Sequence, residues 1–138
     1  MAARIKVTKQ EYETLAALRY ALRRFVHFSE DAAQHAGLTP QQHQALLAIK
    51  GFPGRDQVTV GELAERLQVR HHSAVGLADR LVAERLVIRA GDEADRRRVY
   101  LKLTSRGEAL LERLSAAHKE QLRRLRPELK ELLERLGG

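Results

Sequence analysis

The stretch from residue 59 to residue 104 constrains the fold more than any other part of the sequence. Thr59 and Glu62 have the spacing of a capping box, in which each side chain accepts a hydrogen bond from the backbone N–H of the other residue. Apolar residues then recur at three- and four-residue intervals on both sides of a tight turn at residues 68–70, which predicts two packed helices. These apolar residues are Leu63, Ala64, Leu67, Ala74, Leu77, Ala78, Leu81, Val82 and Leu86.

Two strand-like segments follow, at residues 87–90 and 99–103, and apolar and polar residues alternate in the second. The run between them is rich in turn-forming residues and ends in three consecutive arginines, Arg96, Arg97 and Arg98. Helix, turn, helix and a hairpin with a basic tip together predict a winged helix-turn-helix module. Residues 55–58 are expected to form a loop, with a short third strand against the hairpin as a further option.

Helices are predicted on both sides of these elements. Capping-box patterns at residues 8–11 and 39–42 open a long helix through about residue 36 and a shorter helix that stops at residue 51. A further box at residues 105–108, with either Thr104 or Ser105 as the cap, opens a long C-terminal helical pattern. Gly37 is expected to end the first of them in a left-handed conformation. Residues 1–7 are expected to form a loose arm, and residues 137–138 to fray.

Pro127 is expected to divide the C-terminal pattern, because proline removes a backbone donor and restricts the residue before it. We therefore expect helices at about 105–125 and 127–136. The predicted fold class is mainly α with a small antiparallel β wing, comprising six helices and one hairpin in a single domain of residues 1–138. In it, residues 39–104 form the winged module and long helices flank that module.

Composition excludes several classes of protein. The 138 residues suffice for one domain, and the absence of cysteine excludes disulfide frameworks and thiol switches. We find no apolar run of about eighteen residues and no signal-peptide pattern, so we expect a cytoplasmic protein without a membrane span. The net charge of +7, supplied largely by arginine, suits a polyanionic partner, whereas 4% aromatic residues argue against a base-stacking platform.

Several motifs resemble the MarR family of bacterial transcription regulators. The run D-E-A-D-R-R-R-V-Y-L-K-L-T at residues 92–104 resembles the wing signature of the family, and D-R-L at residues 79–81 and L-T-x-x-G at residues 103–107 also match. The flanking helices agree in order and length, so the resemblance covers nearly the whole chain. It implies a homodimer that binds double-stranded DNA and is held together through residues 8–36 and 105–138.

The geometry of a winged module predicts how such a protein reads DNA. The helix that begins near His71 is expected to enter a major groove, and Arg97 to enter the adjacent minor groove, where negative potential is concentrated. Asp95 can pair with Arg97 and orient it, a role that the resemblance also implies, although an ordinary exposed ion pair is the alternative. The candidate DNA-binding residues are Thr59, Arg70, His71, His72, Ser73, Gly76, Arg80, Asp95, Arg96, Arg97 and Arg98.

The start of the second helix departs from the family pattern. Many members carry S-x-S-T-V-S-R where this chain has R-H-H-S-A-V-G at residues 70–76. Arg70 thus replaces a usual capping serine, and Gly76 replaces an outward arginine. His71 and His72 either contact phosphate more strongly when protonated or simply face solvent.

A narrow leucine seam along the C-terminal pattern favours packing against a partner helix, with packing inside its own domain as the alternative. The resemblance implies a pocket for a small anionic or phenolic effector between the dimer helices and the winged module. Arg19, Arg23 and His27 could meet such an anion, or could be solvated or interfacial side chains. The candidate dimer-interface residues are Tyr12, Leu15, Leu114, His118, Leu122, Leu125, Leu129, Leu132 and Leu136.

Three other functions compete with regulation. An enzyme is disfavoured, since no glycine-rich phosphate loop, G-x-S-x-G or H-E-x-x-H motif occurs. Metal sensing would need histidines at zinc-site spacing, which the sequence lacks, so we expect neither a metal nor a cofactor. The third alternative is an architectural or non-specific nucleic-acid-binding protein with the same winged module, and sequence selectivity distinguishes it from a regulator. The side chains that could converge on a metal are His27, Glu30, Asp31, His35, His43 and His118.

Overall fold

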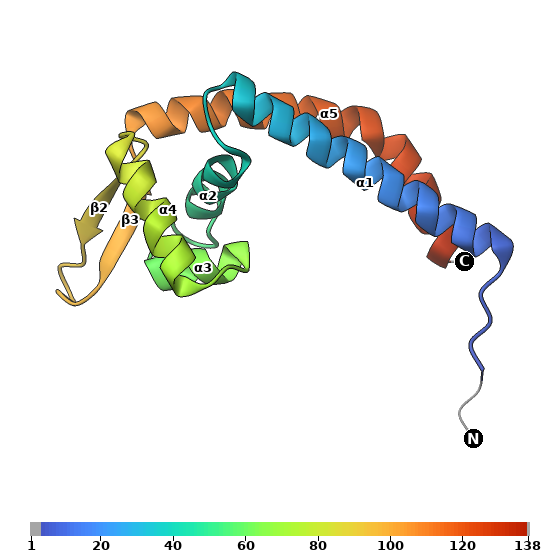
Figure 1. The fold of residues 1–138 in the computed structure, drawn as a ribbon, viewed down its shortest axis with the longest axis horizontal. Helices are drawn as coiled ribbons and strands as arrows, with labels where there is room; N and C mark the ends of the chain where they lie inside the picture. Colours follow the sequence, from blue (N-terminus) through green and yellow to red (C-terminus); the bar gives the residue numbers. More distant parts are fainter. Residues whose placement is uncertain (1–3, 138) are drawn as a thin grey trace. The chain divides into compact units, whose positions relative to one another are not determined.

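The computed structural model describes residues 4–137 and divides into two compact units. Unit 1 comprises Met1–Asp31 with Ala116–Gly138, and unit 2 comprises Ala32–Ser115. The first residues of the expected loose arm, 1–3, and the expected fraying end, Gly138, lie outside the described residues. The elements (Figure 1) are α1 (Lys9–His35), α2 (Pro40–Lys50), β1 (Gln57–Val58), α3 (Val60–Leu67), α4 (His71–Ala83), β2 (Val87–Gly91), β3 (Val99–Leu103) and α5 (Ser105–Gly137).

Unit 2 contains the predicted helix-turn-helix and hairpin. Strands β2 and β3 pair antiparallel with Val87 opposite Leu103, and β1 adds a third strand to the free side of β3, so the sheet order is β1-β3-β2. The optional third strand at residues 55–58 is therefore present. Helices α2, α3 and α4 pack with this sheet around fully buried aliphatic side chains, the largest of which are Leu46, Ile49, Val58, Leu63, Leu77, Leu81, Leu86, Val87 and Leu101.

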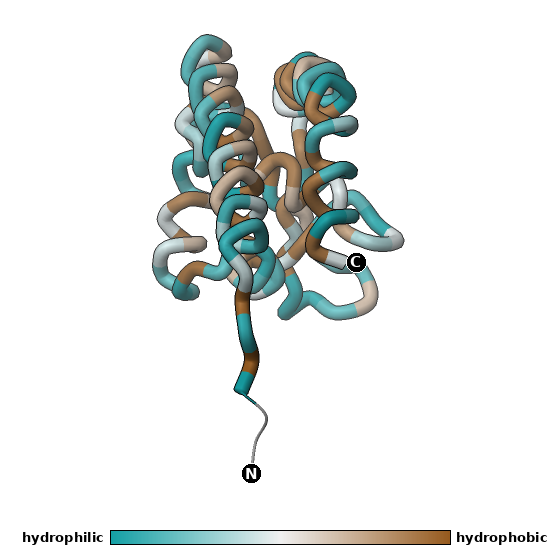
Figure 2. The backbone as a smooth tube through the Cα atoms, turned by 90° about the vertical axis from the view of Figure 1, so that its right-hand side faces the viewer, coloured by the Kyte–Doolittle hydropathy of each residue, from teal (hydrophilic) through white to brown (hydrophobic). Residues whose placement is uncertain are grey.

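Unit 1 consists of most of α1 and the C-terminal two thirds of α5. Arg24 of α1 forms a bidentate ion pair with Glu128 of α5, at 2.9 and 3.0 Å. His118 of α5 accepts or donates a hydrogen bond with the Ser29 hydroxyl at 2.8 Å, and its ring meets Phe25 edge-on. Figure 2 shows hydrophobic and hydrophilic residues alternating along the turns of both helices, as expected for helices that bury one face.

Capping explains where most helices begin. Reciprocal hydrogen bonds between side chain and backbone join residues 8 and 11, 39 and 42, and 59 and 62, which confirms the three predicted capping boxes at these positions. Gly37 follows α1 with φ +83°, the left-handed conformation predicted for it. Gln68 ends α3 in the same region of backbone space, with φ 56°.

The prediction that Pro127 divides the C-terminal pattern is wrong. Helix α5 runs without interruption from Ser105 to Gly137 with Pro127 inside it, so the described residues form five helices and not six. Pro127 lies on the exposed side of the helix, where water can hydrate the carbonyl that loses its partner. Leu125 and Leu132, on either side, are buried, and their packing keeps both halves of the helix in line.

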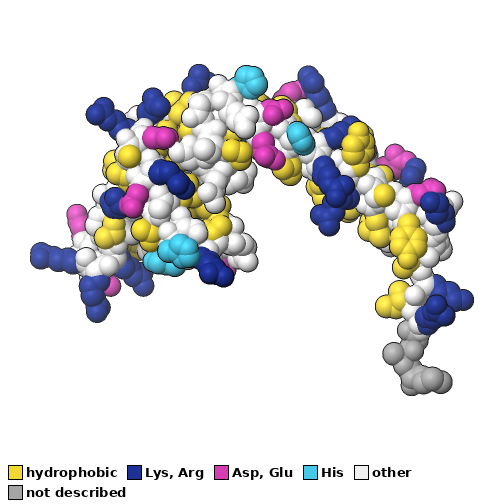
Figure 3. Space-filling view, viewed as in Figure 1, with side chains coloured by type: hydrophobic (Ala, Val, Ile, Leu, Met, Phe, Trp, Pro, Cys, Tyr) yellow, Lys and Arg dark blue, Asp and Glu magenta, His cyan; other side chains and the backbone are white. Residues whose placement is uncertain are grey.

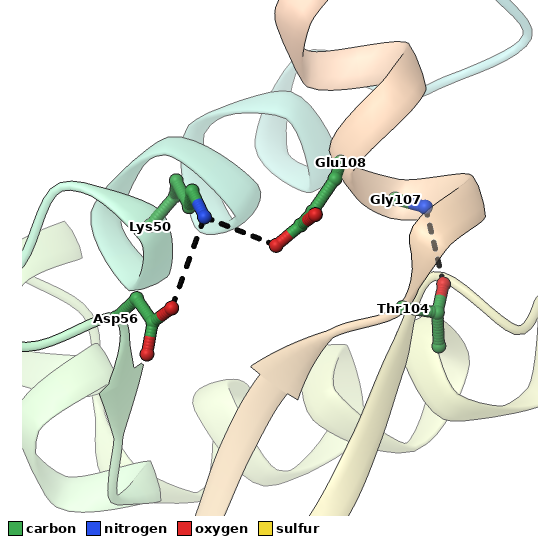
Figure 4. Close-up of polar contacts among 5 residues, drawn as sticks. All are labelled: Lys50, Asp56, Thr104, Gly107 and Glu108. Atoms are coloured by element: carbon green, nitrogen blue, oxygen red, sulfur yellow. Dashed lines mark hydrogen bonds and ion pairs between the residues drawn. The ribbon is translucent and has the colours of Figure 1, made fainter.

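The start of α5 also differs from the predicted capping box. Of the two expected caps, Thr104 and Ser105, Thr104 is the cap: its hydroxyl accepts a hydrogen bond from the Gly107 N–H at 3.1 Å and donates one to the Arg85 carbonyl at 2.6 Å. The Glu108 carboxylate does not complete a box. It instead pairs with Lys50 of α2 at 3.0 Å, and this contact raises the pKa of the Lys50 ammonium (Figure 4).

Gly107 is required by a close approach of two backbone segments. A Cβ atom at this position would lie 2.2 Å from the Leu86 carbonyl oxygen and 3.1 Å from its carbonyl carbon. Because both atoms belong to the backbone between α4 and β2, no side-chain rearrangement can relieve that overlap. The glycine of the L-T-x-x-G motif is therefore explained by packing at the base of the hairpin.

We predict that Gly107→Ala lowers the free energy of unfolding by about 1–3 kcal/mol, because the backbone must shift to accept the methyl group. Urea denaturation followed by circular dichroism measures this loss. Gly61→Ala is the matched control, since a Cβ there makes only an ordinary contact, 3.9 Å from the Thr59 hydroxyl. Equal stabilities for the two variants would contradict the packing argument.

Candidate nucleic-acid interface

The first helix of the helix-turn-helix is fixed at its N-terminus by a network around Glu62. Burial raises the pKa of the Glu62 carboxyl, but hydrogen bonds from the Thr59 N–H and the Arg55 guanidinium outweigh burial and leave the pKa below its usual value. Arg55 also lies over the rings of Phe52 and Tyr100. The guanidinium of Arg55 is thus directed into unit 2, and Thr59 serves as a structural cap whatever else it contacts.

Helix α4 begins without a side-chain cap. Arg70 occupies the N-cap position with extended backbone (φ −70°, ψ 152°), and its side chain makes no capping hydrogen bond. No side chain caps the backbone N–H groups of the first turn, so they can donate hydrogen bonds to solvent or to a ligand. His71, His72 and Ser73 follow, and all three are exposed. In Figure 3, histidine side chains show over the part of unit 2 that α3 and α4 form.

Further along α4, one face is buried and the other is exposed. Ala74, Leu77, Ala78 and Leu81 belong to the core of unit 2 or border it. On the exposed side, the Asp79 carboxylate forms an ion pair with Arg89 of β2, which ties the helix to the hairpin. The three residues of the D-R-L motif therefore have different environments: Asp79 is ion-paired, Arg80 is exposed and Leu81 is fully buried.

The wing tip, residues 92–98, is organised by two aspartates. The Asp95 carboxylate accepts hydrogen bonds from the backbone N–H of Arg97 at 3.0 Å and from its guanidinium Nε at 3.4 Å. The Arg97 side chain is 93% exposed, so this contact holds its inner end while its outer end projects into solvent. Asp92 accepts from the N–H of Ala94 at 2.9 Å and shapes the tip in the same way.

Arg96 and Arg98 flank Arg97, and both are exposed. A hydrogen bond with the Tyr100 hydroxyl, reinforced by the charge of Asp95, raises the pKa of the Arg98 guanidinium. Basic side chains gather at the free end of the β2–β3 hairpin in Figure 3. Unit 2 therefore contains all the candidate DNA-binding residues: Thr59 at the N-cap of α3, one group at the start and outer face of α4, and a second group at the wing tip.

The candidate dimer-interface residues fall into three groups by burial. Leu114 lies in the core of unit 2, and Leu125 and Leu132 are also buried within the single chain. His118, Leu129 and Leu136 are half-buried. Tyr12, Leu15 and Leu122 remain exposed, by 59%, 47% and 44%. Part of the leucine seam thus packs within its own chain, as the alternative interpretation had it, and only some of its residues are left for a partner.

The candidate effector-binding residues lie on the exposed surface of α1. Arg19, Arg23 and His27 recur every four residues and therefore share one side of the helix. A groove of about 900 Å³ also exists in unit 1, lined by the N-terminal turns of α1 and the last turns of α5, but none of the three basic residues lines it. The structure consequently brings the three together along one helix and not in an enclosed pocket.

Residues 4–137 contain no cluster of three histidine, aspartate or glutamate side chains that could hold a metal ion. None of the helices described is long and apolar enough to cross a membrane. Sequence reasoning missed three residues that position the interface: Arg55, Arg89 and Tyr100. Only Arg89 could have been suspected, because a lone arginine in a short strand after a D-R-L helix has an acidic partner within reach.

Helices α3 and α4, the tight turn between them and a hairpin with a basic tip define a winged helix-turn-helix protein. Comparison with known proteins agrees, since a family model described as "MarR family" matches residues 36–98. The HTH-type transcriptional repressor MdtR of Bacillus subtilis (strain 168) is 32% identical over 89 residues, which are 64% of this chain. That match spans 56% of the length of the repressor.

Solved structures extend the likeness to almost the whole chain. The YusO protein from Bacillus subtilis is 27% identical with a TM-score of 0.66, covering 96% of this chain and 94% of that one. BpsR of Bordetella bronchiseptica, whose DNA binding is described as regulated by 6-hydroxynicotinic acid, is 25% identical with a TM-score of 0.61, covering 88% and 96%. The winged module at residues 36–98 is therefore similar to that of the MarR family of transcriptional regulators.

The network at the start of α3 predicts an acid-sensitive contribution to stability. Because the folded-state pKa of Glu62 is depressed, its stabilising effect is present above the ordinary carboxyl pKa of 4.5 and is lost as the pH falls through the folded value. We expect Glu62→Gln to lower the free energy of unfolding by about 0.5–1 kcal/mol at pH 7. Urea denaturation at several pH values should show this difference shrinking below pH 4.5. A difference that stays constant with pH would contradict the assignment.

Proposed function

We propose that this protein is a cytoplasmic transcriptional repressor that binds double-stranded DNA sequence-specifically as a homodimer. The observation that carries the proposal is the wing tip: the Arg97 guanidinium is 93% exposed, and Asp95 holds its inner end. A guanidinium fixed in this manner can enter a narrow minor groove without first losing much side-chain freedom. The uncapped start of α4, with Arg70 and two exposed histidines, supplies the second contact surface, for the major groove and its phosphates.

Relatives support the same reading. MdtR is described as a transcriptional repressor, and BpsR as a DNA-binding protein controlled by a small molecule. The net charge of +7 favours association with DNA but does not require sequence specificity. The discriminating experiment is binding to the DNA upstream of the protein's own gene, at two salt concentrations, with random duplex as competitor. Binding that the competitor abolishes would leave only a non-specific or architectural role.

We predict that Arg97→Ala weakens operator binding by about 1–3 kcal/mol, because the minor-groove contact is lost while the fold is unaffected. Fluorescence anisotropy at fixed salt measures the change. Arg123→Ala is the control, since it removes the same charge from a side chain of α5 that is 76% exposed. If the two variants bind alike, Arg97 makes no specific contribution and the loss reflects overall charge alone.

The proposed dimer uses the apolar side chains that unit 1 leaves exposed. Tyr12, Leu15, Leu22 and Val26 on α1 and Leu122 on α5 are each at least 44% exposed. Exposed aliphatic and aromatic groups at helical spacing are typical of an interface with a partner chain. Dimerisation would also present two copies of α4 to successive major grooves, as a palindromic operator requires.

We expect Leu15→Glu to shift the protein from dimer to monomer, because it places a charge in the proposed apolar interface. Size-exclusion chromatography with light scattering gives the mass directly. Operator affinity should fall together with the dimer, since each monomer holds one half-site and avidity disappears. Lys130→Glu, an acidic substitution at an exposed position on α5, should leave both properties intact. A dimeric Leu15→Glu variant would place the interface elsewhere.

We further propose that a small anionic or phenolic effector releases the protein from DNA. Support comes from BpsR, whose stated regulator carries a carboxylate, and from the basic row Arg19, Arg23 and His27 on α1. A ligand that binds one arrangement of the dimer more tightly would change the spacing of the two α4 helices. Effector screening by thermal shift, repeated on Arg23→Ala, tests whether this row takes part.

A further inference from the structure

The exposed side of helix α4 carries an apolar patch that the DNA-binding residues considered so far do not explain. Val75 is 38% exposed although its neighbours Ala74 and Leu77 are fully buried. Gly76 is the next residue, in the middle of the helix along its length, and a Cβ atom at that position would meet nothing within 4 Å. Glycine weakens a helix relative to alanine, and no contact inside the protein requires it here.

The remaining exposed groups of α4 offer little for reading purine bases. Bidentate recognition of guanine or adenine uses arginine, lysine, asparagine or glutamine. Within His71–Ala83 only Arg80 belongs to this set, and it lies one turn beyond Gly76. Asp79, which could accept from cytosine, is engaged by Arg89. Val75 and Gly76 themselves therefore present an apolar side chain and an open space, whereas the exposed hydrogen-bonding side chains of His71, His72 and Ser73 lie one turn earlier on the helix.

We propose that Val75 and Gly76 read the C5-methyl group of a thymine in the major groove. The isopropyl group of Val75 packs on the methyl group, and the missing side chain of Gly76 lets the edge of the base pair approach the helix backbone. The flanking charges suit a duplex as the occupant of this surface, because Arg70 and Arg80 on either side and the arginines of the wing tip are all exposed. This inference rests on the proposed DNA-binding function.

The direct test removes the methyl group and nothing else. A duplex site is first selected from a random pool by the full-length protein, and each thymine of the half-site is then replaced in turn by deoxyuridine. At one position we expect about a 3–5-fold loss of affinity, the effect of one buried methyl group. Val75→Ala should bind the thymine site more weakly and should no longer distinguish thymine from deoxyuridine at that position, which a double-mutant cycle quantifies.

Gly76→Ala provides a second readout that a structural role would not produce. Because the Cβ has open space, alanine should raise the Tm of the free protein by about 2–4 °C. The same methyl group should hinder the approach of the base pair and weaken binding to the selected site. Leu47→Ala is the control for removal of an exposed aliphatic side chain, since Leu47 lies on α2 and is 46% exposed.

The possible outcomes separate the thymine-reading patch from the DNA-binding function on which it rests. A selected site that binds equally well with thymine and deoxyuridine at every position, or a Gly76→Ala variant that binds as tightly as the parent, would overturn the thymine-reading patch and leave the DNA-binding function standing. A random pool that yields no enriched sequence would overturn both. Loss of the methyl dependence in Leu47→Ala as well as in Val75→Ala would assign it to overall stability and overturn the patch.

Discussion

The close approach of Gly107 to the carbonyl of Leu86 is the constraint on which the winged module depends. Leu86 immediately precedes β2, and Gly107 lies in the first turn of the helix that follows β3, so this contact fixes both ends of the hairpin at its base. Thr104 reinforces the junction, because its N–H donates to the Leu86 carbonyl at 3.0 Å and its hydroxyl donates to the Arg85 carbonyl. Arg85 itself has φ 61°, which lets the chain reverse direction between α4 and β2. The end of α4, the base of the wing and the start of α5 are thus joined at one point.

The arginines of unit 2 divide into those that hold the fold and those that face outward. Arg55 is engaged by Glu62 and by two aromatic rings, and Arg89 by Asp79. Both pairs join elements that must keep a fixed geometry, the first at the start of α3 and the second between α4 and β2. The outward arginines among the candidate DNA-binding residues lie at the start of α4, in its last turn, and at the wing tip. A net positive charge alone could not predict this division, because it depends on which guanidinium has a carboxylate within reach.

Local signals predicted most of the fold, and long-range pairing explains what they missed. Thr39 and Thr59 were recognisable as caps because a capping box needs only four consecutive residues. The Asp95–Arg97 contact was predictable for the same reason, being confined to a tight turn. Glu108, by contrast, has the spacing of a capping box but pairs with Lys50, a residue 58 positions away. The prediction for Pro127 is wrong because the local cost of proline in a helix does not include the burial of Leu125 and Leu132, which is a property of the tertiary structure.

Two departures from the family pattern at the start of α4 both carry a cost to the free protein. A serine at position 70 would accept from a first-turn N–H and stabilise the helix by about 1 kcal/mol, whereas Arg70 makes no such bond. Gly76 costs a similar amount relative to alanine, about 1 kcal/mol, without any packing that requires it. Both costs fall on the exposed side of a helix whose buried side packs well, so the core of unit 2 can offset them. Residues that lower helix stability without a compensating contact inside the protein are expected at functional surfaces. Arg70 places a positive charge beside backbone N–H groups that have no capping partner. Gly76 leaves space at the helix surface for a close approach. Both features favour binding only when a negatively charged ligand of complementary shape lies against α4.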